Sequence, residues 1–411
     1  MAHYFEDLEE LGRWAASSRV VVDPGADLWS FAELDAEGGR YYAQQPELKR
    51  VVGFIARQVA SVNLNLYTWD EDGARSRNYP SQHPAARFLE LPAGDDPKIS
   101  TTAMQFKESL MIDKLIYDRY CALIEYDERT GLPIKMTRLP AARVKFKGKA
   151  GVVDGATYHR EDGQKIELPL DVLFFSVGYT AGTGSNGTSP IRAIRQLLDG
   201  NQEALNFRSQ MLARAARIPG VLTHPKVMDD KAYERLQSSW REYNASGAKA
   251  GSEPILEDGT QYEQLKPLSG DDVLDLDGRK LSAEEIATMY WIYPELLGLR
   301  EGTNSNMDAL KQMLWSICLS PYVTEWQQSW DRLVRSQFRT QNRYVDADLD
   351  GKMMGSWKEE SEITSRAVGG PYLTVDEARA RRNMSPIEGG DKLIVPLNVT
   401  KGGKASPMDG E

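Results

Sequence analysis

Two long amphipathic stretches flank a small insert, and this arrangement restricts the architecture of the chain more than any other feature. Ser189 and Pro190 are typical of a helix start, and apolar residues then recur at helical spacing to Ile218, which predicts a helix about 40 Å long. A second helix is predicted from about Asp272 to Trp291. Because a long helix with polar interruptions is hard to bury on every side, we expect the pair to carry the insert away from the main body.

The insert between the two helices, about fifty residues long, has the pattern of a β-α-β unit. Val221-Leu222-Thr223 and Pro254-Ile255-Leu256 are predicted as short strands, the second just before a turn at Asp258-Gly259. Apolar residues at helical spacing predict a helix over Asp229–Tyr243.

The two flanking stretches differ in charge. Residues 189–217 carry five arginines against two acids, a net charge of +3, whereas residues 271–285 carry six acids against two basic residues, a net charge of −4. These charges could pair within one subunit or between subunits, or they could form ordinary solvated helix faces.

The region before this pair predicts an α+β unit in which helices pack on a short antiparallel sheet. Helices are expected from Pro46 and over Thr102–Tyr117, and the first forty residues are expected to form an arm with limited structure. Alternating or compact apolar runs predict strands at Leu64–Trp69, Cys121–Tyr126, Lys135–Leu139, Ala156–Tyr158 and Val172–Val177.

The region after the pair begins with a polar, glycine-containing loop at Gly298–Asn306, which is either an ordinary connection or a mobile loop facing something that moves past it. A long helix with a kink at Pro321 should follow, then a strand at Arg343–Leu349. Thr374, with an acid three residues later, predicts a capped helix start, and the polar tail is expected to be disordered.

Composition excludes several classes of protein. The net charge of −10 argues against a protein that grips DNA over a broad surface, which needs a basic footprint. Cys121 and Cys318 lie in apolar runs, so we expect no disulfide framework and a reducing compartment, and the four histidines offer little for a zinc site. The acidic N-terminus does not look like a signal peptide, and no apolar run is long enough to span a membrane.

Several local patterns imitate functional motifs. Gly182–Gly187 matches a dinucleotide-binding glycine pattern, but the acid twenty positions on lies within a helix, so a flexible hinge is favoured. Asp346–Gly351 begins like a calcium loop but has Trp357 where a glutamate is required, so a strand with an acidic face is favoured. Trp326 and Trp330 could stack on bases, although a core or a subunit interface is favoured. No nucleophile or P-loop pattern is present, so the sequence predicts no catalytic site, metal or cofactor, and no enzyme.

A collinear series of short segments resembles the HK97-type portal family of tailed bacteriophages over roughly residues 40–398. The segments that carry the resemblance are Pro46–Trp69, His83–Pro92, Pro219–Leu222, Pro254–Gly259, Glu285–Gly298, Leu373–Arg379 and Pro386–Asp391. Each is weak alone, and their common order is the stronger signal.

The resemblance implies an α+β portal fold that assembles into a ring-shaped homo-dodecamer around a central channel. Its regions would be an N-terminal arm (1–39), a wing (40–188 and 292–357), two stem helices (189–217 and 269–291), a β-α-β clip (218–268), a helical crown (358–398) and a disordered tail (399–411). The second part of the wing would include a tunnel loop (298–306) and a long helix (307–342). Because such a ring has heterologous interfaces, the opposed helix charges would complement one another between copies.

The resemblance further implies a channel for genome packaging and ejection at one capsid vertex of the virion, assembled in the host cytoplasm, with no membrane association. Its partners would be double-stranded DNA, the large terminase subunit, then the head–tail adaptor, and the major capsid protein. A nucleotide-binding enzyme that uses Gly182–Gly187, and an oligomeric adaptor that never touches DNA, are the alternatives.

Three sets of candidate residues follow. The tunnel loop comprises Gly298, Arg300, Glu301, Gly302, Thr303, Asn304, Ser305 and Asn306. The acids expected to face the channel, where they would reduce DNA grip, are Asp271, Asp272, Asp275 and Asp277. The clip residues expected to contact terminase or adaptor are Lys226, Asp229, Asp230, Lys231, Arg235, Arg241 and Lys249.

Overall fold

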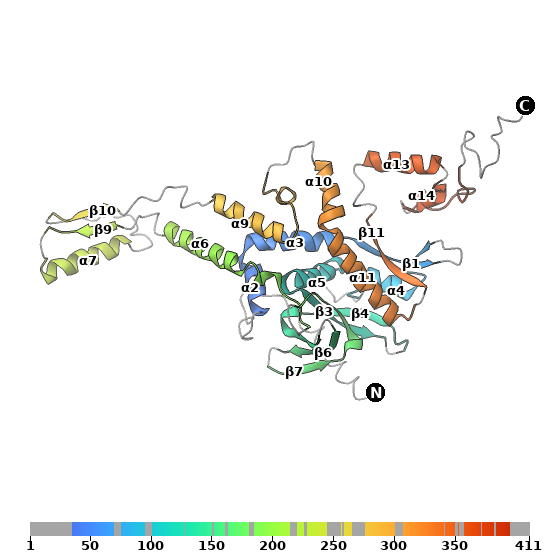
Figure 1. Cartoon of the computed structure of the whole chain (residues 1–411), viewed down its shortest axis with the longest axis horizontal. Helices are drawn as coiled ribbons and strands as arrows, with labels where there is room; N and C mark the ends of the chain where they lie inside the picture. Colours follow the sequence, from blue (N-terminus) through green and yellow to red (C-terminus); the bar gives the residue numbers. More distant parts are fainter. Residues whose placement is uncertain are drawn as a thin grey trace, which may run out of the picture. The chain divides into compact units, whose positions relative to one another are not determined.

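A computed structural model of the chain describes residues 35–69, 75–94, 101–127, 129–149, 152–160, 163–180, 185–213, 220–225, 228–244, 256, 259–264, 276–300, 307–340, 342–349, 352, 357–370, 372–381 and 384–394. The chain divides into two compact units. The first comprises Met1–Gly302 and Cys318–Ala347, and the second comprises Thr303–Ile317 and Asp348–Glu411. Figure 1 shows the elements of each.

The helices of the first unit follow the predicted pattern, with two additions. Helix α3 (Pro46–Ala60) has a proline in its first turn and packs its buried apolar face on α5 (Ala103–Tyr117), whose start is closed by a capping box between Thr102 and Gln105. The sequence did not predict α2 (Asp35–Gln44) or α4 (Pro84–Glu90). The expectation of limited structure before residue 40 is therefore wrong from Asp35 onward, because α2 packs against α3 and α5.

Two antiparallel three-stranded sheets enclose the apolar core of the first unit. One has the order β4-β3-β8, built from Pro133–Leu139, Arg119–Tyr126 and Leu173–Val177. The other has the order β5-β6-β7, built from Val144–Lys149, Val152–His159 and Lys165–Leu168. Short 3₁₀ turns at Ala141–Arg143 and Leu170–Val172 lead into β5 and β8, and Cys121, Leu123, Phe146 and Tyr158 belong to the shared core.

A third sheet has the order β11-β1-β2, built from Arg343–Asp348, Asn63–Trp69 and Arg75–Asn78. The five strands predicted in the first α+β region and the strand at Arg343 are confirmed within two residues at their ends, apart from β6, which starts four residues earlier than predicted. Strands β2, β5 and β7 were missed. The aspartates at 346 and 348 lie in β11, which favours the strand interpretation over a calcium loop.

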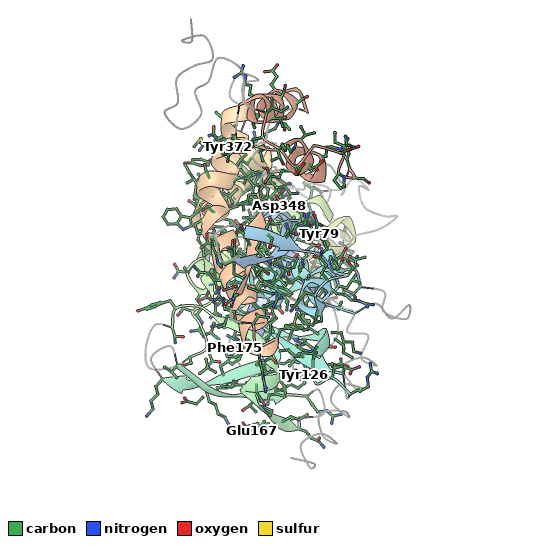
Figure 2. All side chains as sticks on the ribbon, turned by 90° about the vertical axis from the view of Figure 1, so that its right-hand side faces the viewer. Tyr79, Tyr126, Glu167, Phe175, Asp348 and Tyr372 are labelled. Carbon is green, nitrogen blue, oxygen red and sulfur yellow. The ribbon has the colours of Figure 1, made fainter. Side chains whose placement is uncertain are left out.

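Trp326 and Trp330 lie in α11 (Ser320–Gln337) and are core residues, 1% and 0% exposed. Trp326 packs edge-on against Tyr120 of β3 at 5.5 Å, and Trp330 packs against Phe174 of β8 at 4.8 Å. Tyr126 and Phe175, labelled in Figure 2, lie where the same sheet meets α11, since Tyr126 hydrogen-bonds Gln337. The core interpretation of both tryptophans is confirmed, so neither is available to stack on bases.

The prediction of one continuous helix over 307–342 is wrong. Helix α10 (Met307–Met313) is followed by a π-helical turn at Leu314–Cys318, and a separate α11 begins at Ser320 and ends at Gln337. Pro321 occupies the first turn of α11, where its missing N–H has no intrahelical partner to lose. The break that was expected at the proline therefore precedes it.

Asp113 and Lys107 are two of the buried charged residues in the first unit. Asp113 on α5 is 1% exposed and accepts two hydrogen bonds at 2.7 Å from the guanidinium of Arg138 on β4. Lys107, one turn before the middle of α5, is 7% exposed, with its ammonium nitrogen 5.7 Å from the ring centre of Trp330. Burial lowers the pKa of Lys107 to about 8.

The second unit contains α10, α13 (Trp357–Gly369) and α14 (Val375–Arg381). The predicted cap at Thr374 is confirmed, because Glu377 N donates to the Thr374 hydroxyl at 3.2 Å and Thr374 N donates to the Glu377 carboxylate at 2.9 Å. Residues 395–411, the expected disordered tail, lie outside the described residues, as do residues 1–34 of the expected N-terminal arm.

Candidate functional site

The predicted helix pair is present as α6 (Arg195–Ala213) and α9 (Leu276–Met289), which lie side by side in Figure 1. Ser282 Oγ on α9 donates to Asn201 Oδ1 on α6 at 2.8 Å, which fixes their relative register. The first helix starts later than predicted. Pro190–Arg192 is a 3₁₀ turn, and the Ser189 hydroxyl donates to the Ile116 carbonyl at 2.5 Å instead of capping a helix. Residues 214–219, which would extend α6, lie outside the described residues.

Four hydrogen bonds fix the base of α6 to the rest of the first unit. Tyr41 Oη donates to Asp199 Oδ1 at 2.5 Å, and Gln45 Nε2 donates to the Leu198 carbonyl at 2.5 Å. Before the helix, Asn186 Nδ2 donates to the Phe146 carbonyl at 2.9 Å, and its Oδ1 accepts from Phe146 N at 2.8 Å. The base of α6 is thus held by α2, by the start of α3 and by β5.

The glycine-rich loop before α6 is not the flexible hinge that the sequence predicted, at least over Ser185–Gly187. Ser185 is 1% exposed and donates to the Val152 carbonyl at 3.1 Å, and Gly187 N donates to Thr180 Oγ1 at 2.9 Å. These polar groups are already bonded within the protein, so this half of the loop has no free cradle for a phosphate. Residues 181–184 lie outside the described residues.

Gly187 is the residue of the glycine-rich loop before α6 that tolerates substitution least. This loop lies between β8 and α6 and is called the joint below. It has a φ of +74°, and an added Cβ would lie 2.7 Å from the Asp118 carbonyl oxygen. Asp118 cannot move away easily, because Lys114 binds its carboxylate at 3.1 Å and Thr188 N donates to it at 3.2 Å.

We therefore expect Gly187→Ala to lower the free energy of unfolding by about 2 kcal/mol or more, since it combines a left-handed φ with a backbone clash. Urea unfolding followed by tryptophan fluorescence measures this loss. The matched control is Gly155→Ala, because Gly155 has an ordinary φ and no atom within 4 Å of an added Cβ. Equal stabilities of the two variants would contradict the proposed rigidity of the joint.

The predicted clip is a two-stranded antiparallel sheet with one helix. Strand β9 (Gly220–Thr223) pairs with β10 (Gln261–Gln264), and α7 (Asp230–Asn244) lies between them in the chain. The first strand and the helix are confirmed. The second strand was predicted at 254–256 and instead follows the Gly259 turn, while Pro254 and Ile255 lie outside the described residues.

The candidate clip residues on α7 are exposed. Asp229 has a structural role as well, because its carboxylate accepts from Ala232 N at 2.8 Å in the first turn of the helix. Exposed side chains that could meet a partner are Asp230, Lys231, Arg235 and Arg241, whereas Lys226 and Lys249 lie outside the described residues.

The end of α9 is anchored in the core of the first unit. Ile286, Ala287 and Tyr290 are buried, and the Tyr290 hydroxyl donates to the Leu115 carbonyl at 2.9 Å. Burial raises the pKa of Tyr290, so the hydroxyl keeps its proton for this bond. A 3₁₀ turn at Pro294–Leu297 follows and ends at Gly298, whose φ is +69°.

The described start of the candidate tunnel loop is tied back to α9. Arg300 Nη2 lies 2.6 Å from Glu284 Oε2, and a second guanidinium nitrogen lies 3.9 Å from Glu295. The hydrogen bond from Arg300 holds the pKa of Glu284 below its usual range. The sequence did not predict this pairing. Among the loop residues, Glu301, Gly302, Thr303, Asn304, Ser305 and Asn306 lie outside the described residues.

The candidate channel acids are mostly outside the described part of the chain. Asp271, Asp272 and Asp275 lie outside it, and Asp277 belongs to α9 without a described side chain. Their proposed orientation therefore stays a prediction.

Within the described ranges, no three histidine, cysteine, aspartate or glutamate side chains are grouped so that they could hold a metal ion. No helix in the described part of the chain combines the length and apolar character that a bilayer crossing needs. Cys121 and Cys318 are both buried and free, and burial raises the pKa of each thiol.

Known proteins resemble this chain along most of its length. The sequence profile of the family described as "Phage portal protein" matches residues 46–383. The portal protein of Enterobacteria phage HK97 is 23% identical over 348 residues, which cover 83% of this chain and 79% of that protein. The probable portal protein of Streptomyces phage phiC31 is 25% identical over 252 residues, or 59% of this chain. The match spans about half of that relative's length, 55%.

Solved structures share the fold. An HK97 family phage portal protein from Corynebacterium diphtheriae is similar with a TM-score of 0.54 at 12% identity, over 76% of this chain and 96% of that one. A chain in the neck of a native gene transfer agent particle, computed with C12 symmetry, is similar with a TM-score of 0.57 at 19% identity, over 86% and 94% of the two chains. Because the matched profile runs from the start of α3 past the end of α14, the chain belongs to the phage portal protein family.

Proposed function

We propose that this chain forms a homo-dodecameric ring at one vertex of a viral capsid and acts as a conduit for double-stranded DNA during genome packaging and ejection. The observation that carries the proposal is the helix–insert–helix segment from α6 to α9, set in a portal family match that continues on both sides of it. The similar neck chain that belongs to an assembly with C12 symmetry supports twelve copies.

In this proposal the chain of each copy is divided as the sequence suggested. The wing comprises 40–188 and 292–357, the stem α6 and α9, the clip 218–268 and the crown 358–398. The exposed face of α7 in the clip would meet the large terminase subunit during packaging and the head–tail adaptor afterwards. The wing and crown would lie near the major capsid protein, in the virion and, during assembly, in the host cytoplasm.

The acidic segment before and within α9, together with the loop at 298–306, would face the channel. A duplex has to slide past the wall, and each phosphate neutralised by a basic side chain adds salt-dependent affinity and therefore friction. Acids at Asp271, Asp272, Asp275 and Asp277 would keep that affinity low. The pairing of Arg300 with Glu284 supports this assignment, because the Glu284 carboxylate compensates the positive charge that Arg300 brings to the loop.

The two alternatives are less well supported. A nucleotide-binding enzyme would use the Gly182–Gly187 loop, whose described half is bonded to β5 and β6. An adaptor that never touches DNA would not need a channel. Electron microscopy of the purified chain separates these functions, because a ring with a hole as wide as a duplex supports the conduit and a compact monomer excludes it. Saturable binding of ATP or a dinucleotide would favour the enzyme.

Neutralising the acidic segment is expected to slow DNA passage. In the triple variant Asp272→Asn, Asp275→Asn, Asp277→Asn, packaging into purified procapsids should fall several-fold, because the wall loses the charge that repels phosphates. Exposed acids away from the stem provide the control, Asp154→Asn with Glu167→Gln on the β5-β6-β7 sheet, where Glu167 is labelled in Figure 2. Unchanged packaging and ejection in the triple variant would show that these acids do not line the channel.

A further inference from the structure

Helix α9 ends in a Schellman turn in which a tryptophan takes the left-handed position. Ile292 N donates to the Ala287 carbonyl at 2.9 Å, and Trp291 N donates to the Thr288 carbonyl at 3.0 Å, which are the two bonds of this motif. Trp291 has a φ of +60°. Glycine usually fills this position, because any Cβ is strained there. A bulky aromatic residue at this position is therefore a strained choice.

The strained backbone conformation at Trp291 does not bury its side chain in the core of this chain. Tyr290 and Ile292 on either side are 3% and 1% exposed and are fixed in the core, whereas Trp291 is 78% exposed. With both neighbours held inward, the backbone directs the indole outward. Strained backbone positions are concentrated at functional sites, and tryptophan is prominent among residues that dominate interface affinity.

The charges near Trp291 favour a protein partner over DNA. Glu285 on the last turns of α9 is exposed, and Glu295 in the following 3₁₀ turn is partly exposed. Arg300, 3.9 Å from Glu295, offsets part of this charge, whereas the exposed Glu285 carboxylate would repel a phosphate backbone and attract a basic surface. The segment that leads into the neighbouring helix α6 provides such a surface, since Arg192 is exposed and small or polar side chains accompany it at Ala193 and Gln196.

The register between the helices places that surface at the same height as Trp291. Ser282 on α9 is level with Asn201 on α6, and the two helices run in opposite directions. Trp291 follows Ser282 by as many residues as Arg192 precedes Asn201. If the axis of the proposed ring runs along these helices, rotation keeps height constant and brings Trp291 of one copy to the level of Arg192 in the next.

We infer that Trp291 anchors the contact between adjacent copies by packing against residues 192–196 of the next copy, where the 3₁₀ turn leads into α6. There the guanidinium of Arg192 would lie over the indole, and Glu285 would complement its charge. The inference rests on the proposed ring. It names the surfaces that form its interface, one on each side of the subunit, as a heterologous contact requires.

Two substitutions at one position separate an interface role from a structural role. Trp291→Gly removes both the indole and the left-handed strain, whereas Trp291→Ala removes the indole and leaves the strain. Both should raise the protein concentration at which half of the chains are in rings by about tenfold or more, measured by mass photometry. In the monomer, however, Trp291→Gly should raise the urea midpoint above that of Trp291→Ala.

The opposite surface provides the complementary test. Arg192→Ser should weaken the ring as Trp291→Ala does, whereas Arg129→Ser in the turn between β3 and β4, also exposed, should leave it unchanged. Introduced cysteines at Thr288 and Gln196 should give an interchain ladder on oxidation, with little background because both native cysteines are buried.

The outcomes also separate this inference from the proposed function. Wild-type rings with unchanged assembly in Trp291→Gly and Trp291→Ala, or cross-links only within one chain, would overturn the interface and leave the conduit intact. A wild-type chain that stays monomeric at all concentrations would contradict both the Trp291 interface and the proposed conduit.

Discussion

Replacing Asp113 by alanine is expected to lower the free energy of unfolding by about 3–5 kcal/mol, because it leaves the Arg138 guanidinium without its carboxylate between α5 and β4. Asp113 is 1% exposed and the Arg138 side chain 22%, so water can replace the lost carboxylate only in part. Chemical denaturation monitored by tryptophan fluorescence measures the loss.

The double variant Asp113→Ala, Arg138→Met should recover a substantial part of that loss, since it removes the uncompensated charge as well. The matched control is Glu167→Ala, which breaks an exposed ion pair with Lys147 and should change stability far less than Asp113→Ala does. If Asp113→Ala and Glu167→Ala were equally mild, the pair between α5 and β4 would not be a major contribution to the fold.

Replacing Lys107 by methionine is expected to stabilise the protein by about 3 kcal/mol at pH 7. The pKa of Lys107 is lowered from 10.5 to about 8 by burial, so the folded state binds the proton more weakly than the unfolded state does. Methionine has a similar length, fills the same space beside Trp330 and carries no charge to desolvate.

The free energy of unfolding should depend on pH in a direction that the lowered pKa of Lys107 fixes. Between about pH 8 and 10.5 the unfolded chain still binds the Lys107 proton and the folded chain does not, so this group makes the protein more stable as pH rises. Below pH 8 its unfavourable contribution is fully present. The gain from Lys107→Met should therefore be constant below pH 8 and shrink through that window. A gain that does not change with pH would show that packing, and not the charge, causes it.

Periodicity predicted the elements whose apolar pattern is complete within one segment. Helix α3 and strand β3 were located within one or two residues, because each buries a continuous apolar face. Strand β2, with the sequence Arg-Ser-Arg-Asn, has no apolar residue and is a strand only because it pairs with β1. Strand β5 could have been found, since Val144 and Phe146 alternate with lysines.

The candidate site was predicted less completely than the fold, because its contacts join residues far apart in sequence. The position of the 3₁₀ turn and of Gly298 follows from the Pro-x-x-Leu-Gly pattern. Nothing local indicates that Arg300 would pair with Glu284, sixteen residues earlier, or that Asn186 would bond to β5. The most informative missed residue is Trp291, since its left-handed φ becomes apparent only when the hydrogen bonds at the end of α9 are known.

The left-handed tryptophan has a genetic consequence. Tryptophan has one codon, TGG, and a single base change to GGG encodes glycine, the residue that this backbone conformation prefers. A single base substitution is therefore enough to relieve the backbone strain at position 291. A population of genomes passaged under conditions in which the indole contributes nothing should accumulate this change. Where the indole is needed for growth, the same substitution should be removed as often as it arises.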